Sequence, residues 1–344
     1  MTKADNATRV GVIGAGAWGT ALAQMLASDG SEVLIWAREP ELVAQINAEH
    51  CNTLFLPGVD LSPRITATGN MADLAALPIL LVVVPAQFLA GVLAGLGNGG
   101  AVRRDLVLCA KGIEAGSGRL MLDVAKDAAP GAELAVLSGP TFAREVALGL
   151  PTAITLACGG GEAQWQRLSS AIARPAFRPY YSDDLIGAEI GGAVKNVLAI
   201  ACGVVDGLGL GENARAALIA RGFAEMLRFG EAKGARAETL SGLCGLGDLV
   251  LTCASVASRN YSLGKALGEG QSAAEALSGK ASVAEGAATA PVLAEIARAC
   301  GIAMPIVEAV CRILSGAAPA RQVVSEILAR PLKAELPGGR SAPA

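Results

Sequence analysis

The sequence predicts a chain in two parts, an α/β half with a doubly wound parallel sheet followed by an all-α half. Three observations predict this fold class. A glycine-rich turn separates the first apolar run from a helical segment near the N-terminus. Further short apolar runs, rich in β-branched residues, each end in a loop, as buried parallel strands do. After Ser182 the apolar residues recur with the period of a helix.

The glycine-rich turn is the strongest local signal. Arg9-Val-Gly-Val-Ile13 is predicted as a short, mostly apolar strand, Gly14-Ala-Gly-Ala-Trp-Gly19 follows at once, and residues 20–27 have helical character. A G-x-G-x-x-G pattern between a strand and a helix is typical of a Rossmann-like dinucleotide site. Gly14 permits the tight turn, Gly16 lets a pyrophosphate approach the backbone, and Gly19 lets helix and strand pack closely. The helix start offers amides and the positive end of its dipole to phosphates. A glycine turn without a ligand is the alternative.

The second predicted strand, residues 32–36, ends without the acid that NAD-specific sites usually place there. Ala37 and Arg38 follow it instead. An arginine suits the 2′-phosphate of NADP by its charge and its paired hydrogen bonds. The alternative is a solvated arginine that pairs with Glu39. The sequence therefore favours NADP over NAD as the cofactor.

Three further strands are predicted at residues 79–84, 106–110 and 133–137, and two more, at 152–157 and 177–181, would extend the sheet. The carboxyl ends of strands in such a sheet line the ligand crevice. Lys111 follows one of these ends, where a cation can meet a substrate oxygen or the nicotinamide carboxamide. Gly112 beside it allows close approach of the backbone. A surface lysine is the alternative.

A long apolar helix carries one lysine. Ser182 is predicted to cap this helix, with Asp183 and Asp184 in its first turn. The face of Lys195 holds only small residues, namely Ala188, Gly191, Gly192, Ala199 and Cys202. Two glycines inside a helix cost on the order of 1 kcal/mol each, so something must approach closely there. Either another helix packs on this face, or a ligand or buried ion pair meets Lys195.

Lys195 is also the best candidate for acid–base chemistry. Histidine most often does such work, but His50 is the only one and lies in a polar loop. A lysine can take this role when burial and nearby cations lower its pKa toward neutrality, and Lys111 can be such a cation. Asp248, which opens a further helix, either orients Lys195 or is an ordinary acid at a helix start.

The remaining helices are predicted at about residues 214–233, capped by Asn213 and closed by Gly234, and at 290–299 and 305–314. The first of these looks like core.

Two helix starts contain residues suited to ligands. Ser258 is predicted to cap a helix in which Arg259, Asn260 and free amides make a phosphate site. Ser282-Val-Ala-Glu285 fits a capping box, so Glu285 has a structural explanation as well as a functional one.

Composition excludes several classes of protein. A net charge of −3 gives no basic footprint for nucleic acid. Eight scattered cysteines without a C-x-x-C pair indicate reduced thiols, and one histidine speaks against a metal site. The mean hydropathy of +0.47 is high, but the charge-free stretch 74–102 is interrupted by Pro85 and fits a strand, loop and helix. We expect no signal peptide, no integral membrane segment and a cytoplasmic location.

These motifs resemble those of bacterial NAD(P)-dependent glycerol-3-phosphate dehydrogenases over roughly residues 9–330. The segments that carry the resemblance are GAGAWGTALA (14–23), NTLFLPG (52–58), AKGIE (110–114), SGPTFAREV (138–146), EIGGAVKNVLAIACGVVDGLGLGENARAALI (189–219), GLGDLVLTC (245–253), SRN (258–260) and VAEG (283–286). Other hydroxyacid dehydrogenases share the two-domain plan, but the SGP and SRN segments favour this family.

The resemblance implies roles for individual residues. Lys195 would exchange a proton with the substrate C2 oxygen, Lys111 would touch both cofactor and substrate, and Asp248 would complete the catalytic set. The implied substrate residues are Asp248, Ser258, Arg259 and Asn260, with Gly139 and Thr141 lining the site. The implied cofactor residues are Ala17, Trp18, Ala143, Arg259, Val283 and Glu285, beside the glycine turn and Arg38. The family often has serine at positions 17 and 141, so any contact of Ala17 must be through the backbone, whereas Thr141 keeps a hydroxyl.

The expected activity is reversible hydride transfer between NAD(P)H and dihydroxyacetone phosphate, giving sn-glycerol 3-phosphate for glycerophospholipid synthesis. The alternatives are a β-hydroxyacid dehydrogenase with a carboxylate substrate and a dinucleotide-binding regulator. We expect flexible tails at residues 1–8 and 333–344, a dinucleotide-binding domain at 9–184 and a substrate-binding domain at 185–332. The expected partner is a small phosphorylated substrate, and no nucleic acid is expected. A homodimer is possible, but the sequence does not give the oligomeric state.

Overall fold

The computed structural model describes residues 10–96, 104–278 and 284–331 of the chain. The predicted tails, residues 1–8 and 333–344, lie outside this part, as do Ser282 and Val283.

The first half of the chain folds around a sheet whose strand order is β3-β2-β1-β4-β5-β6-β7-β8. All neighbouring strands are parallel except β6 and β7, which are antiparallel. The strands are β1 (Val10–Ile13), β2 (Val33–Trp36), β3 (Ile65–Thr68), β4 (Ile79–Val82), β5 (Asp105–Leu108), β6 (Glu133–Ser138), β7 (Thr152–Cys158) and β8 (Phe177–Ser182). The predicted doubly wound sheet is confirmed, and the two predicted extra strands do extend it.

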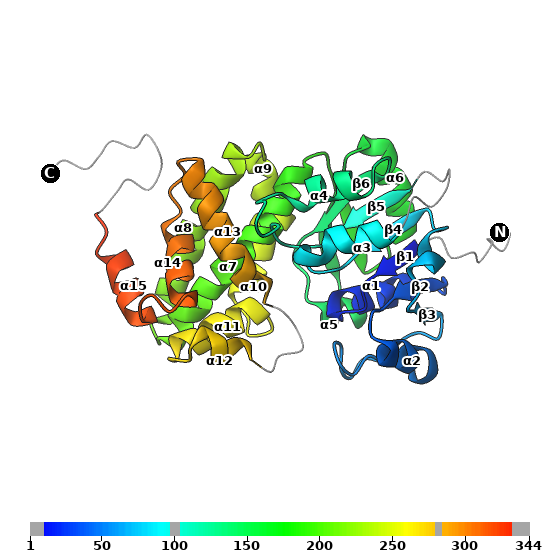
Figure 1. Cartoon of the computed structure of the whole chain (residues 1–344), viewed down its shortest axis with the longest axis horizontal. Coiled ribbons are helices and arrows are strands. Elements are labelled where there is room, and N and C mark those ends of the chain that lie inside the picture. The colour runs from blue at the N-terminus through cyan, green and yellow to red at the C-terminus, as the bar shows by residue number, and fades with distance from the viewer. Residues whose placement is uncertain (1–9, 97–103, 279–283, 332–344) are drawn as a thin grey trace.

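Helices cover both faces of this sheet, as Figure 1 shows. They are α1 (Ala17–Ala27), α2 (Pro40–Glu49), α3 (Leu89–Gly95), α4 (Met121–Ala128), α5 (Ala143–Ala147) and α6 (Gly161–Ile172). In β4, Leu81 packs in the apolar cluster that includes α1 and α6, whereas Leu80 and Val82 pack in the cluster that includes α3 and α4. Burial on both faces explains why these strands read as continuous apolar runs rather than alternating ones.

The second half is helical and is built around α7 (Leu185–Gly207). The helices after it are α8 (Gly211–Ala232), α9 (Ala237–Leu240), α10 (Asp248–Cys253), α11 (Arg259–Gly268), α12 (Ala273–Leu277), α13 (Glu285–Ala299), α14 (Pro305–Leu314) and α15 (Ala320–Leu328). Every residue from Gly187 to Val205 is buried. Glycines let α11 approach α7: a Cβ added to Gly203 would lie 2.0 Å from the Tyr261 carbonyl oxygen.

α7 is the one helix in the described ranges that is long and apolar enough to cross a membrane, and the whole apolar window of it is buried inside the protein. A core helix has the same composition. The charge-free stretch that starts at residue 74 forms β4, a 3-10 turn (Ala86–Phe88) and α3, as predicted, up to residue 96.

Several local predictions are wrong. Asp184, not Ser182, caps α7, because its carboxylate accepts the Gly187 amide at 2.8 Å while the Ser182 hydroxyl accepts the Asp184 amide instead. α8 begins before Asn213, with Leu210 at its N-cap, and only one face of it is buried. Glu285 is the first residue of α13, with Ala284 as N-cap, so it does not stand at the third helical position that a capping box requires.

Candidate active site

The glycine turn between β1 and α1 has the geometry that its sequence predicts. Gly14 has a φ of +110°, which only glycine adopts readily, and its amide donates to the Trp36 carbonyl at 3.0 Å. A Cβ on Gly19 would lie 1.8 Å from the Gly14 carbonyl oxygen, so α1 and the turn pack as closely as glycine allows. A Cβ on Gly16 would meet nothing within 4 Å. The turn therefore offers a clear approach to the start of α1, and it fits the pyrophosphate of a dinucleotide.

The other predicted cofactor residues of this half lie at element ends. Ala17 and Trp18 are the first two residues of α1, and Ala143 is the first of α5. Trp18 and Ala143 are partly buried against the same apolar cluster. Arg38 follows β2 with its side chain 75% exposed and pairs with Glu39 at 2.8 Å. A solvated Arg38 paired with Glu39 was the alternative to an NADP contact. The ion pair nevertheless leaves the guanidinium open to solvent and to a ligand.

The central feature is a buried carboxylate between two lysines that come from the two halves. Asp248, at the start of α10, has no solvent exposure. Its Oδ1 accepts a hydrogen bond from Lys195 Nζ at 2.6 Å, and its Oδ2 accepts one from Lys111 Nζ at 2.8 Å. Lys111 also donates to the Gly139 carbonyl at 3.3 Å. The sequence predictions for Lys111, Lys195 and Asp248 thus fall on one contiguous cluster, at the carboxyl ends of β5 and β6.

Small residues on α7 make room for this cluster. A Cβ on Gly191 would lie 2.4 Å from the Cys244 carbonyl oxygen, in the π-helical turn (Leu243–Gly247) that precedes α10. A Cβ on Gly192 would lie 2.9 Å from the Ser138 hydroxyl and 3.3 Å from Lys111 Cγ. Both alternatives for the glycine face are therefore realised, since a backbone turn packs on it and a buried ion pair meets Lys195.

The electrostatics of Lys195 suit proton transfer. Burial lowers its pKa to about 8, and the positive charge of Lys111 acts in the same direction, while Asp248 opposes both. The predicted combination of burial and a neighbouring cation is confirmed. A lysine with a pKa near neutrality exchanges protons in both directions at physiological pH.

Two further polar residues, Thr252 and Asn196, contact this cluster and were not predicted from the sequence. Thr252 accepts a hydrogen bond from Lys195 Nζ at 2.8 Å and donates to Asp248 Oδ1 at 3.2 Å. Asn196 Nδ2 donates to the Lys111 carbonyl at 3.4 Å. The signal for Thr252 was its spacing, because a residue four positions after Asp248 shares the same helix face.

The predicted phosphate site lies at the start of α11. Ser258 caps the helix, as predicted, by accepting the Tyr261 amide at 3.3 Å. Arg259 is exposed, whereas Asn260 is buried. The Asn260 Oδ1 accepts the Gly286 amide at 3.0 Å, so this residue also ties α11 to the start of α13.

Glu285 lies near both the predicted phosphate site and the two lysines. Burial raises the pKa of its carboxyl, and the charges of Arg259, Lys111 and Lys195 oppose that rise. Glu285 therefore lies within electrostatic reach of all three cations. The Gly139 carbonyl, which accepts from Lys111, also accepts a hydrogen bond from the Thr141 hydroxyl at 3.3 Å. Of the predicted site residues, only Val283 lies outside the described part.

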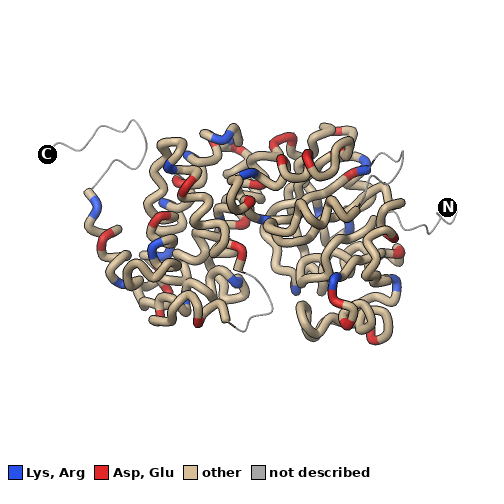
Figure 2. The backbone as a smooth tube through the Cα atoms, in the orientation of Figure 1, with Lys and Arg blue, Asp and Glu red and all other residues tan. Residues whose placement is uncertain are grey.

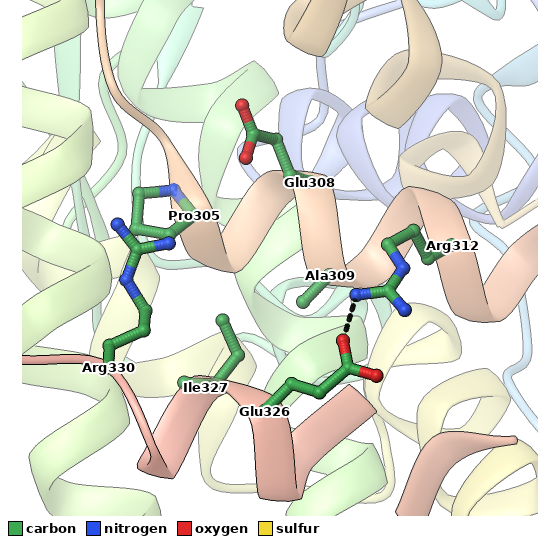
Figure 3. Close-up of a pocket in the computed structure, with 7 residues that line it drawn as sticks. All are labelled: Pro305, Glu308, Ala309, Arg312, Glu326, Ile327 and Arg330. Carbon is green, nitrogen blue, oxygen red and sulfur yellow. Dashed lines mark hydrogen bonds and ion pairs between the residues drawn. The ribbon is translucent and has the colours of Figure 1, made fainter. Parts of the chain in front are cut away.

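A separate cavity of about 240 Å³ lies between α14 and α15 (Figure 3). Arg312 and Glu326, which line it, pair with each other, and none of the predicted site residues borders it. Charges of both signs are interspersed over both halves of the chain (Figure 2). Within the described ranges, no group of three or more His, Cys, Asp or Glu is placed to hold a metal ion.

Two family models match the chain. The N-terminal model of NAD-dependent glycerol-3-phosphate dehydrogenase covers residues 9–164, and the C-terminal model of the same enzyme covers residues 184–325. The chain belongs to the NAD-dependent glycerol-3-phosphate dehydrogenase family.

Similar proteins agree with this assignment. A glycerol-3-phosphate dehydrogenase [NAD(P)+] of Novosphingobium aromaticivorans is 71% identical over 328 residues, which is 95% of this chain and 98% of that protein. One of Caulobacter vibrioides is 56% identical over 327 residues, again 95% and 98% of the two chains. The crystal structure of glycerol-3-phosphate dehydrogenase from Coxiella burnetii superposes with a TM-score of 0.89 at 39% identity, covering 95% of this chain and all of that one.

Membership confirms several predictions at once. The dehydrogenase is an NAD(P)-dependent oxidoreductase that interconverts dihydroxyacetone phosphate and glycerol 3-phosphate, so its substrate is a small phosphorylated molecule. Its cofactor is NAD or NADP. Family membership therefore argues against the two alternatives, a β-hydroxyacid dehydrogenase and a dinucleotide-binding regulator.

Proposed function

We propose that the dehydrogenase reduces dihydroxyacetone phosphate with Lys195 as the general acid and re-oxidises glycerol 3-phosphate with the same residue as the general base. The observation that carries the proposal is the buried Lys195–Asp248–Lys111 cluster, with Nζ–O distances of 2.6 and 2.8 Å and a Lys195 pKa of about 8. In the reduction, the Lys195 ammonium gives a proton to the C2 oxygen. NAD(P)H, when bound, supplies the hydride for C2.

Asp248 and Lys111 have supporting roles in this proposal. The Asp248 carboxylate accepts a hydrogen bond from each lysine and favours the charged form of Lys195, so that an ammonium group faces the substrate before reduction. Lys111 offers a second positive charge to the oxygen on which negative charge develops. Thr252 fixes the direction of the Lys195 amine, because it accepts one of its three N–H groups.

The two ligands would be held at two helix starts. The glycine turn with Gly14, Gly16 and Gly19, together with the first residues of α1, would take the cofactor pyrophosphate. The start of α11, with Ser258, Arg259 and Asn260, would take the substrate phosphate. Other residues proposed to touch the cofactor are Ala17, Trp18, Lys111, Ala143, Arg259, Val283 and Glu285, and Gly139 and Thr141 would line the substrate.

We infer further that Arg38 makes NADP the favoured cofactor, because β2 lacks the terminal acid that would hold the free ribose hydroxyls of NAD. The domain division is proposed at residues 184 and 185, where the last strand gives way to α7, so that 9–184 bind the cofactor and 185–332 the substrate. The product would feed glycerophospholipid synthesis in the cytoplasm. A measurement of the molecular mass in solution tests whether the enzyme is a homodimer.

The decisive assay measures NADPH oxidation by the purified protein with dihydroxyacetone phosphate, with dihydroxyacetone, and with a panel of carboxylate ketones. Oxidation is expected only with dihydroxyacetone phosphate, because the proposed site at the start of α11 needs a phosphate. Equal rates with dihydroxyacetone, or faster rates with a carboxylate ketone, would refute the substrate assignment. Replacing NADPH by NADH in the same assay gives the cofactor preference.

A further inference from the structure

The segment from Cys109 to Leu122 belongs to the sheet half but is built into the helical half. It leaves β5, carries Lys111 and ends in the first turn of α4. Ile113 and Leu120 pair across it in an antiparallel bridge, and both side chains are buried in the apolar cluster of the helical half. The segment therefore links the placement of Lys111 to the packing between the two halves.

α7 holds this segment along a single face. Gly192 and Asn196 follow Glu189 by three and seven residues, so the three positions share one side of the helix. Asn196 donates to the carbonyl of Lys111 at 3.4 Å, near one end of the segment. Glu189 Oε1 accepts the amide of Leu122 at 2.8 Å, at the other end. Between them, Gly192 leaves space for the aliphatic part of the Lys111 side chain.

Glu189 is an unusual residue for this place. Its side chain is buried, and burial raises its pKa to about 8, with the Leu122 hydrogen bond opposing and the charge of Asp123 reinforcing the rise. The residue at the N-cap of α4, Leu120, has no side chain that can accept a hydrogen bond from the helix start. Glu189 thus serves α4 as a cap supplied by the other half of the molecule.

We propose that Glu189 is a positioning residue for the dehydrogenase reaction: it fixes the far end of the Lys111 segment on the helix that carries Lys195. By doing so it sets how the two lysines meet on Asp248. The inference rests on the proposed role of Lys111. It does not require that Glu189 touch the substrate or the cofactor.

Glu225 provides a matched control. It is also a buried glutamate, its pKa is raised by burial to about 7, and its carboxylate accepts the Ile306 and Val307 amides at 2.9 and 3.3 Å. Like Glu189 it caps a helix start, that of α14. Both hydrogen-bond partners of Glu225 lie within the helical half. Substituting Glu225 should therefore cost a similar amount of stability to substituting Glu189, without displacing Lys111.

The experiment is a double-mutant cycle that measures kcat, KM and thermal stability for Glu189→Ala, Lys111→Ala, Glu225→Ala and the combinations with Lys111→Ala. Glu189→Ala is expected to lower kcat/KM by about 10- to 100-fold, the range that misplacement of a catalytic group produces. This loss should largely vanish in the Lys111→Ala background. The loss from Glu225→Ala should be smaller and should multiply with that from Lys111→Ala to within about twofold.

Glu189→Gln and Glu189→Asp complete the test and cover the case in which Glu189→Ala does not fold. Glutamine keeps an oxygen acceptor at the same reach and should restore kcat/KM to within about threefold of the parent. Aspartate is one methylene shorter and should not restore it. The inference is overturned if the losses from Glu189 and Lys111 substitutions multiply, or if glutamine is no better than aspartate. A Lys111→Ala variant with parent activity would instead refute the proposed role of Lys111.

Discussion

Lys195 and the two arginines of the predicted ligand sites are cations in very different surroundings. The Lys195 side chain is 7% exposed, and protein atoms on α10 already accept its hydrogen bonds. Arg38 is 75% exposed at the side chain, and Arg259 is exposed at the start of α11. The centre of the site is therefore held in place before any ligand arrives, whereas its two ends stay open to solvent.

The difference matches the work proposed for each cation. Proton transfer depends on the position and the pKa of one amine, so burial and fixed partners are useful at the centre. A phosphate must enter and leave, so its cationic partners have to be reached from solvent. Substitutions at the centre are therefore expected to change kcat, and substitutions at the ends to change KM or the cofactor dissociation constant.

The largest effect is expected from Lys195→Met, which removes the proton donor and keeps an apolar side chain of similar length. The kcat should fall by about 10²- to 10⁴-fold, the usual contribution of a positioned acid or base, while NADPH binding in a titration stays close to the parent. The control is Lys265→Met, at a half-exposed lysine of α11 that pairs with Asp206 near the end of α7, and it should retain activity. A loss of less than tenfold in kcat would remove Lys195 from the mechanism.

Arg259→Ala tests the open end at the start of α11. A hydrogen bond to a charged group is worth about 1.5–3 kcal/mol, so KM for dihydroxyacetone phosphate should rise by roughly 10- to 150-fold. Lysine at this position should restore binding only in part, because it lacks the paired donors of arginine. Sulfate should compete with substrate in the parent and less so in the variant.

The control for this position is Arg312→Ala, which removes an arginine paired with Glu326 away from the site. If Arg259→Ala changes neither KM nor inhibition by sulfate, the phosphate is bound elsewhere. NADPH affinity has to be measured as well, since Arg259 is also proposed to reach the cofactor.

The pH dependence of the two reaction directions tests the role of the buried Lys195. With the Lys195 pKa lowered to about 8, kcat/KM for reduction, which needs the ammonium, should be level below that pH and fall about tenfold per pH unit above it. Oxidation of glycerol 3-phosphate needs the neutral amine and should instead rise with pH up to about 8. Profiles taken above pH 7 avoid the titration of the substrate phosphate. Identical profiles in the two directions would contradict the proposal.

The smallest effect is expected from Arg38→Ala. The exposed guanidinium should contribute about tenfold to NADPH affinity, at the low end for a charged hydrogen bond, and nothing to NADH affinity. Isothermal titration with each cofactor measures this difference. Arg64→Ala, at an exposed arginine of the same half that pairs with Glu32, is the control. Equal losses for the two cofactors would show that Arg38 does not distinguish them.

Local sequence was sufficient wherever the physical cause is local. The glycine turn, the apolar strands β1, β4, β5 and β6, and the Ser258 cap were predicted because backbone conformation, burial on both faces and capping leave a pattern within a few residues. β3 was missed because it is a short strand in which the exposed Thr66 interrupts the apolar residues. The cap of α7 was misplaced because Ser182 and Asp184 are both good caps, and only the geometry of the turn separates them.

The fold class, the glycine turn, the family and the odd charge of Lys195 in an apolar helix could all be predicted from the amino-acid sequence. The contact of Asp248 with both lysines, 53 residues away at Lys195 and 137 at Lys111, depends instead on the tertiary fold. The same is true of the hydrogen bonds that Glu189 and Asn196 make at the two ends of the Lys111 segment. Contacts between residues so far apart in the chain leave no periodic pattern, and the desolvation that lowers the Lys195 pKa exists only once the two halves have packed together.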